Sequence, residues 1–465
     1  MSNRFRLLRS ADRPTTEIRP LAAAALPGWL EQQPEEVRAW IGATGFAAES
    51  GQHCLVPGPL GTPAAVLLGV DDRTDAWSYA GLPTSLPKGP YRLAADLSAA
   101  EAQAAALGWA LGTYAFDRYR PAAIPDNALV WPDGCDAAEV ERLVDAVFLV
   151  RDLVNTPAND LGPSELQAAV EEVGARYGAH CEAVVGDALL ERGLPAVHAV
   201  GRAAAQAPRV VRLAWGSEGP RIALIGKGVC FDSGGLDIKP SQGMLLMKKD
   251  MGGAAHALAL AQLVMSAGLP LRLTLIIPMV ENAIAGNAFR PGDVLRTRKG
   301  STVEVGNTDA EGRLILCDAL AWAQEDEPDL MLDFATLTGA ARVALGPELP
   351  ALFCNADPLA RALESFAAEV RDPLWRLPLH QPYRQSLRSR IATLNNVSDG
   401  PFAGAITAAL FLQHFVDDKV PWAHFDLFTW NAKERPGRPV GGEAMTLRAC
   451  WALLREAAVQ GRLPF

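Results

Sequence analysis

Hydrophobic residues recur at near-helical spacing over residues 136–154, and this pattern predicts one long amphipathic helix. Pro157 disfavours helix at the residue before it, so the helix is expected to end just ahead of that proline. The segment before this helix is rich in Ala, Pro and Gly and differs in composition from the rest of the chain. We therefore predict an N-terminal domain of residues 1–135, of assembly or regulatory type, and a second domain of residues 136–465 that begins with the helix as a linker.

After the linker helix, short apolar runs alternate with helical patterns, and Ser164 is placed to cap the first of these helices. The predicted strands are Val210–Ala214, Ile222–Ile225, Leu271–Pro278, Thr302–Val305, Leu330–Phe334 and Ala423–Phe428, and the predicted helices are Ser164–Tyr177, Gly252–Ala267, Gly312–Gln324 and Met445–Ala458. This alternation implies an α/β fold, with a small N-terminal α/β domain and a larger C-terminal domain whose mostly parallel sheet is sandwiched between helices. Ligands of such sheets bind beyond the carboxyl ends of the strands. We therefore look to the loops that follow Ile225, Val305 and Phe334.

Composition and charge exclude several classes of protein. The 465 residues are 49% hydrophobic and 21% charged, which excludes a disordered chain, a collagen-like chain and a coiled-coil filament. The net charge of −10 argues against a general surface for nucleic acid or for anionic membranes. No run of about 18 uncharged apolar residues is present, and charges interrupt the N-terminal segment where a signal peptide would be apolar. Seven scattered cysteines without a CxxC pair indicate free thiols, so we predict a soluble cytoplasmic protein without a membrane partner.

Three glycine-containing stretches of the second domain hold an unusual density of ionisable residues: 226–239, 247–253 and 306–314. Glycine lets the backbone approach a ligand closely. In the last stretch Asp309 and Glu311 stand at alternate positions, so in extended chain both carboxylates point the same way. Two such carboxylates repel each other unless a cation lies between them. Taken alone, this pair is more often a solvated turn.

The three stretches together favour a metal site. They bring Asp232, Asp250, Asp309, a glutamate and two lysines to loops that are expected at one edge of the sheet. They contain no pair of His or Cys residues, which disfavours a tetrahedral structural zinc site. Ligation dominated by carboxylates suits a pair of divalent cations, such as Mn²⁺, Mg²⁺ or Zn²⁺, that share bridging acids.

These motifs resemble those of a known family. The stretch 307–314, with sequence NTDAEGRL, is similar to the signature of the leucyl aminopeptidase (cytosol aminopeptidase) family of metallopeptidases. The stretches 226–240 and 249–255, together with Asn155-Thr156-Pro157 and residues 335–340, match further segments of that family in kind and order. The resemblance covers about residue 151 to the C-terminus. No motif of the N-terminal 135 residues could be matched.

The resemblance implies the roles of the site residues. Asp232 and Glu311 would bridge two metal ions, Lys227 and Asp250 would bind one of them, and Asp309 would bind the other. A lysine ligand must be neutral, so its pKa has to be lowered by burial and by the two cations. Lys239 would stabilise the oxyanion of the tetrahedral intermediate, and Arg313 would hold a bicarbonate ion as general base. None of the seven histidines is needed.

The resemblance further implies an aminopeptidase that removes the N-terminal residue of peptides with a free N-terminus, using a metal-bound water as nucleophile. The expected cofactors are two divalent ions per subunit, Mn or Zn with Mg or Co as alternatives, and bicarbonate. Met247, Thr336, Leu337 and Gly339 would line the substrate pocket, and a count along the chain adds Phe428 and Asn431, where relatives carry small or flexible apolar residues. The expected assembly is a homohexamer. Two alternatives remain open: a DNA-binding or regulatory protein on the same scaffold, and another metallohydrolase such as a phosphoesterase.

Overall fold

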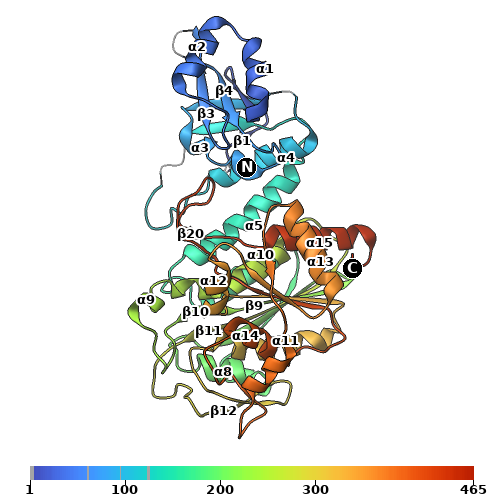
Figure 1. Ribbon diagram of the computed structural model, residues 1–465. Helices are drawn as coiled ribbons and strands as arrows, with labels where there is room; N and C mark the ends of the chain where they lie inside the picture. The colour runs from blue at the N-terminus through green and yellow to red at the C-terminus, as the bar shows by residue number, and fades with distance from the viewer. Residues whose placement is uncertain (1–4, 60–61, 95, 123–125) are drawn as a thin grey trace. The chain divides into compact units, whose positions relative to one another are not determined.

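The computed structural model describes residues 5–59, 62–94, 96–122 and 126–465 (Figure 1). The chain divides into two compact units. The first holds residues 1–148 and 433–440, and the second holds residues 149–432 and 441–465. The helix α5 (Ala137–Asn155) corresponds to the predicted linker helix, and the division between the units falls within it.

The first unit contains a six-stranded sheet with helices. Its strands are β1 (Leu7–Leu8), β2 (Thr16–Leu21), β3 (His53–Pro57), β4 (Pro63–Gly69), β5 (Gly89–Leu93) and β6 (Asn127–Val130), and its helices are α1 (Leu26–Glu31), α2 (Glu35–Thr44), α3 (Leu82–Ser85) and α4 (Ala99–Gly112). The strand order is β1-β6-β5-β2-β4-β3, and every pair is parallel except β3 with β4. This small α/β unit agrees with the fold predicted for the N-terminal part of the chain.

The second unit contains the large sheet. Its main strands are β7 (His180–Val185), β8 (Arg209–Trp215), β9 (Arg221–Gly226), β10 (Gly228–Asp232), β11 (Arg272–Asn282), β14 (Leu330–Ala335), β15 (Ala351–Cys354), β16 (Trp375–Arg376) and β18 (Trp422–Asp426). The order is β16-β15-β18-β14-β9-β11-β8-β7, and β10 also pairs with β11. The central strands β18, β14, β9 and β11 are parallel, and antiparallel pairs occur only toward the edges.

Helices cover both faces of this sheet. The helices of this unit are α6 (Pro163–Arg176), α7 (Ala188–Glu191), α8 (Pro195–Gly201), α9 (Ser241–Met244), α10 (Gly252–Ser266), α11 (Gly312–Ala323), α12 (Gly339–Leu345), α13 (Asp357–Glu369), α14 (Gly404–Gln413) and α15 (Leu447–Gln460). Figure 1 shows β9 passing between α10 and α11, and both helices pack on that strand. Strand β9 is buried along nearly its whole length, which explains why its sequence is a continuous apolar run. The predicted α/β sandwich is confirmed.

The short strands β12 (Val294–Arg296), β13 (Thr302–Glu304) and β17 (Leu394–Asn395) form a separate three-stranded sheet, and β19 (Trp430–Asn431) pairs with β20 (Gly441–Gly442). The predicted strand Thr302–Val305 therefore does not lie in the main sheet. Ser164 was also wrongly predicted as a cap. Helix α6 begins at Pro163, whose fixed φ suits a first helical position, and the backbone amide of Gly162 donates to Glu165 Oε2 at 3.0 Å.

Two further expectations can be compared with the structure. All seven cysteines are free thiols, as their spacing predicted. Across the described ranges, no helix combines the length and the apolar character that a membrane crossing requires.

Candidate functional site

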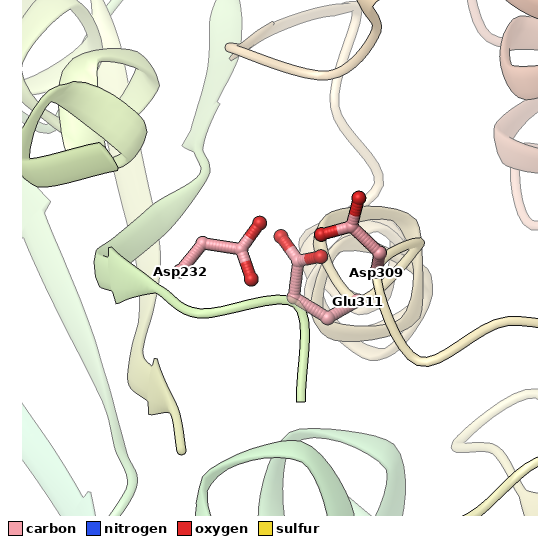
Figure 2. A group of neighbouring side chains, drawn as sticks. All are labelled: Asp232, Asp309 and Glu311. Atoms are coloured by element: carbon pink, nitrogen blue, oxygen red, sulfur yellow. The ribbon is translucent and has the colours of Figure 1, made fainter. Parts of the chain in front are cut away.

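Three carboxylates converge near the carboxyl ends of β9 and β10 (Figure 2). Asp232 is the last residue of β10, whereas Asp309 and Glu311 lie in the loop that leads into α11. One oxygen of each carboxylate lies within 4.8 Å of the other two. Within the described part of the chain, this is the one group of three such side chains close enough to hold a metal ion. The repulsion of three adjacent acids favours a bound cation.

Lys227 follows β9 directly and reaches into this group of acids. Its backbone amide donates to the carbonyl of Phe334 at 2.9 Å, which fixes where the side chain begins. Its Nζ lies 2.8 Å from Asp250 Oδ2 and 3.0 Å from Glu311 Oε1, and it donates to the carbonyl of Thr336 at 2.9 Å. The side chain is only 3% exposed.

Lys239 occupies a similar position on the other side of the cluster. Its Nζ lies 2.9 Å from Asp232 Oδ2 and 2.5 Å from Asp309 Oδ1. The structure thus brings together all of the predicted metal ligands and the predicted oxyanion lysine. Each lysine lies between two acids, so the geometry alone does not separate the proposed ligand lysine from the proposed catalytic one.

Burial and mutual repulsion shape the protonation of the site. Burial, and then the neighbouring Asp232 carboxylate, raise the pKa of Glu311 well above its usual range. The same two causes, partly offset by Lys239, raise the pKa of Asp309 to about 6. Burial would lower the pKa of Lys227, but the adjacent carboxylates, led by that of Asp250, outweigh it and raise that pKa. Divalent cations among these oxygens would offset the repulsion, and oxygen ligands of this kind suit Mn²⁺ or Mg²⁺.

Two asparagines that the sequence did not single out hold the acidic loops in place. Asn282 Nδ2 donates to Asp232 Oδ1 at 2.8 Å and to a loop carbonyl, that of Thr308, at 3.0 Å. Asn396 Oδ1 accepts from the backbone amide of Gly306 at 2.7 Å, and Asn396 Nδ2 donates to the carbonyl of Asn307, also at 2.7 Å. Both side chains are fully buried and come from distant parts of the sequence, so no local spacing could have identified them.

Arg313 lies in the first turn of α11, close to the cluster but not on the wall of the cleft. Its Nη1 donates to the carbonyl of Asn396 at 2.7 Å. Its Nε is buried, and among the described residues it has no hydrogen-bond partner. Burial lowers the pKa of Arg313 to about 10. The guanidinium therefore keeps a donor available for a small anion such as bicarbonate.

A cleft of about 330 Å³ opens over the acidic cluster. The metal-ligand candidates and Lys239 line it, and so do the four residues predicted for the substrate pocket, Met247, Thr336, Leu337 and Gly339. Phe428 also lines the cleft, as its position in the chain indicated, whereas Asn431 is buried and is not part of the described wall.

Three further charged residues line the cleft, and the sequence analysis gave none of them a role: Lys249, Arg342 and Asp426. Asp426 Oδ1 accepts from the amides of Leu337 and Thr338 at 3.1 Å each, and its Oδ2 accepts from the Thr338 hydroxyl at 2.6 Å. Asp426 thus supports the loop between β14 and α12. Burial lowers the pKa of Lys249 to about 8 against the opposing effect of the next residue, Asp250.

No histidine belongs to the described wall of the cleft. His256, in α10, is fully buried; its Nδ1 faces the carbonyl of Gly252 at 2.7 Å, and its Nε2 accepts from the amide of Met445 at 2.9 Å. Burial lowers the pKa of His256 to about 4. The neutral ring therefore joins two segments of the second unit.

Comparisons with known proteins agree with these features. Residues 148–451 match the model of the cytosol aminopeptidase family, catalytic domain, and residues 16–132 match the M17 aminopeptidase N-terminal domain. The N-terminal match corrects the sequence analysis, which found no motif there. A "Probable cytosol aminopeptidase" of Rhodococcus opacus (strain B4) is 36% identical over 453 residues, which cover 90% of this chain and 88% of the relative.

Solved structures are also similar. The cytosol aminopeptidase from Coxiella burnetii has 49% identity and a TM-score of 0.94, covering 97% of this chain and 99% of its own. The bottromycin maturation enzyme BotP in complex with Mn has 34% identity and a TM-score of 0.87, covering 96% of this chain and 100% of its own. One of these similar structures thus contains manganese.

Proposed function

Because this chain belongs to the cytosol aminopeptidase family and is an aminopeptidase, we propose that it removes the N-terminal residue of peptides at a site for two divalent metal ions. The observation that carries the proposal is the convergence of Asp232, Asp309 and Glu311 within 4.8 Å, with a lysine on each side. Family membership favours peptide hydrolysis over the phosphoesterase alternative. No observation favours a DNA-binding role.

The donor set fits two cations that share acids. Glu311 contacts Lys227 on one side and lies with Asp232 in the three-carboxylate group on the other, which supports these two acids as the ligands that both ions would share. Lys227 and Asp250 would complete one position, and Asp309 the other. When bound, divalent ions polarise a carbonyl and lower the pKa of a water molecule toward neutrality. The manganese complex of BotP makes Mn the first ion to test, with Zn, Mg and Co as alternatives.

Lys239 is assigned to the oxyanion of the tetrahedral intermediate. Its side chain is 15% exposed and lines the cleft, whereas that of Lys227 is 3% exposed. The Lys239 ammonium can therefore face the substrate carbonyl while it remains close to Asp232 and Asp309. A donor fixed at that point stabilises charge that develops in the transition state, an effect of roughly 10²–10³-fold in turnover.

Arg313 is assigned to hold a bicarbonate ion, which would supply the general base. Arginine stays protonated and cannot itself act as the base. Its position in the first turn of α11 and its Nε, which has no hydrogen-bond partner among the described residues, support the assignment, because a bound oxyanion would satisfy that donor. The backbone carbonyl of Asn396 accepts from Arg313 Nη1 and so holds the guanidinium in position.

Substrate binding would use the free α-amine of the peptide at the acidic cluster and the side chain of its first residue in the cleft. The residues assigned to that side chain are Met247, Thr336, Leu337 and Gly339, all of which line the cleft. A cytoplasmic location and a homohexameric assembly are further parts of the proposal. They rest on the name of the family and on its resemblance to this chain.

The direct test is hydrolysis of a panel of aminoacyl amides by protein that has been stripped with a chelator and reloaded separately with Mn²⁺, Zn²⁺, Mg²⁺ or Co²⁺. We expect no turnover without metal, recovery with at least one of the four ions, and no turnover of amides whose α-amine is acetylated. A phosphoester serves as the control substrate. Full turnover by protein that metal analysis finds empty would contradict the proposal.

A further inference from the structure

We propose that Lys249, assisted by Arg342, recognises a carboxylate on the side chain of the substrate's first residue, so that the enzyme favours N-terminal glutamate over its uncharged isostere glutamine. This inference rests on the proposed peptide hydrolysis and names the class of side chain that the cleft accepts. Both cations line the cleft over the acidic cluster.

Lys249 is a buried cation that no acid of the described residues neutralises. It lies in the turn Met247–Met251, and only 5% of the residue is exposed. Its Nζ lies 4.8 Å from the centre of the Phe428 ring, and among the described residues the amine has neither a hydrogen bond nor an ion pair. An ammonium group has three donors, and burying it unpaired is costly. A ligand that supplies an anionic acceptor would remove that cost.

Arg342, in α12, adds a second cation against the same ring. Its Cζ lies 4.7 Å from the centre of Phe428, and within the described structure this guanidinium has no carboxylate partner either. Arg342 is exposed at the wall of the cleft, so it can meet a ligand that enters from solvent. An aromatic ring between or beside two cations lowers their repulsion but does not provide a hydrogen-bond acceptor.

The nearby acids are already committed to other groups. Asp426 accepts from two backbone amides and one hydroxyl of the loop that starts α12. Asp250 contacts Lys227 and accepts from the Thr336 hydroxyl at 2.8 Å. Lys227 and Lys239 each have two acidic partners, so Lys249 differs from them in leaving its charge available to a ligand.

The position of Lys249 points to the first side chain of the substrate. Lys249 follows Met247 on one turn and immediately precedes Asp250, which lies against Lys227 in the acidic cluster. A substrate whose α-amine and scissile carbonyl lie at that cluster would extend its first side chain along the wall formed by Met247, Lys249 and Phe428. A glutamate side chain has both the length and the charge that such a wall would recognise.

The test compares Glu and Gln 4-nitroanilides with the Mn²⁺-loaded wild type and with the Lys249→Met variant, which keeps the side-chain length and removes the charge. Wild type should favour Glu, and the Glu-to-Gln ratio of kcat/KM should fall roughly 10- to 100-fold in Lys249→Met, the scale of one hydrogen bond to a charged group. Arg342→Met should reduce the ratio less. Lys248→Met is the matched control, because Lys248 is the neighbouring lysine, donates to the Asn155 carbonyl and does not line the cleft.

Because both substrates are compared with the same variant, any general effect on the metal site cancels from the Glu-to-Gln ratio of kcat/KM. An unchanged Glu-to-Gln ratio in Lys249→Met would overturn the inference. A selective loss of Leu-Gly hydrolysis relative to Leu-Gly amide hydrolysis in Lys249→Met would also overturn it. That result would assign Lys249 to the substrate's C-terminal carboxylate. Calorimetric binding of glutamate and glutamine gives a readout without turnover. If wild type bound glutamate more tightly than glutamine but hydrolysed no anilide, the proposed function would fail and the carboxylate recognition would stand.

Discussion

Replacing Gly312 by alanine should damage the acidic cluster by displacing Lys227. Gly312 is the first residue of α11, directly after Glu311. A Cβ at this position would lie 2.5 Å from Lys227 Cε and 2.8 Å from both Cδ and Nζ. Carbon atoms do not approach so closely, and Lys227 cannot simply turn aside. Its amine is held at 2.8 Å from Asp250, at 3.0 Å from Glu311 and at 2.9 Å from the Thr336 carbonyl.

The expected magnitudes differ for stability and for activity. Overpacking a well-packed site costs about 1–3 kcal/mol, and alanine recovers up to about 1 kcal/mol over glycine in a helix. The free energy of unfolding should therefore fall by only about 0–2 kcal/mol. Turnover should fall on the order of 10²-fold, because a shift of about 1 Å at a reacting centre has that effect.

The assay measures turnover of an aminoacyl amide, metal content and denaturant unfolding for Gly312→Ala. Gly42→Ala is the matched control: Gly42 lies in α2 and a Cβ there meets nothing within 4 Å, so this variant should be stabilised by roughly 0.5–1 kcal/mol with unchanged turnover. A Gly312→Ala enzyme with wild-type kcat/KM and full metal content would refute the claim that Lys227 must keep its present position.

Three further predictions concern separate parts of the second unit. Lys239→Met should lower kcat roughly 10²–10³-fold while metal content measured by mass spectrometry stays intact; loss of metal would instead make Lys239 a ligand. Phe428→Ala should raise kcat/KM for Phe and Leu amides relative to Ala amide, because the ring lines the cleft, and an equal change for all three would exclude it from the specificity pocket. Burial lowers the pKa of His256 to about 4 from 6.5, so its contribution to stability is present above pH 6.5 and is lost as pH falls toward 4. Between pH 7 and pH 4 the free energy of unfolding, measured by denaturant titration, should fall by about 3 kcal/mol more in wild type than in His256→Gln. If it fell equally in both proteins, the buried neutral ring would be contradicted.

The sequence predicted five strands of the main sheet, β8, β9, β11, β14 and β18, because buried strands leave regular patterns, and it missed β7, β10, β15 and β16. Strand β9, for example, extends one residue beyond its predicted bounds at each end, and helix α10 ends one residue before its predicted end. Strand β10 was missed because Gly228–Asp232 is short and lies within a motif that resembles a loop. The strand predicted over Thr302–Val305 was wrongly assigned to the main sheet, since a three-residue strand carries no signal about which sheet it joins. The loop that follows it nevertheless brings Asp309 and Glu311 to the site, as predicted.

The candidate site could be predicted where its residues form dense local motifs, as Asp309 and Glu311 do. Asn282 and Asn396 could not, because each acts across a long sequence separation through buried hydrogen bonds. Lys249 stands beside Lys248 in the sequence, and only the structure separates them. The amine of Lys248 donates to a carbonyl, whereas Lys249 lines the cleft and has no hydrogen bond or ion pair within the described ranges. Tertiary contacts of this kind leave no periodic trace in the chain.

The most direct test of the account is a calorimetric titration of chelated protein with Mn²⁺, with hydrolysis of an aminoacyl amide followed in parallel. We predict two equivalents of Mn²⁺ per chain, with turnover rising as the second binds, and the loss of at least one equivalent in Glu311→Gln. Asp418→Asn is the control, since Asp418 is exposed and does not line the cleft. Full turnover at one equivalent, or two equivalents and wild-type turnover in Glu311→Gln, would contradict the two-metal site.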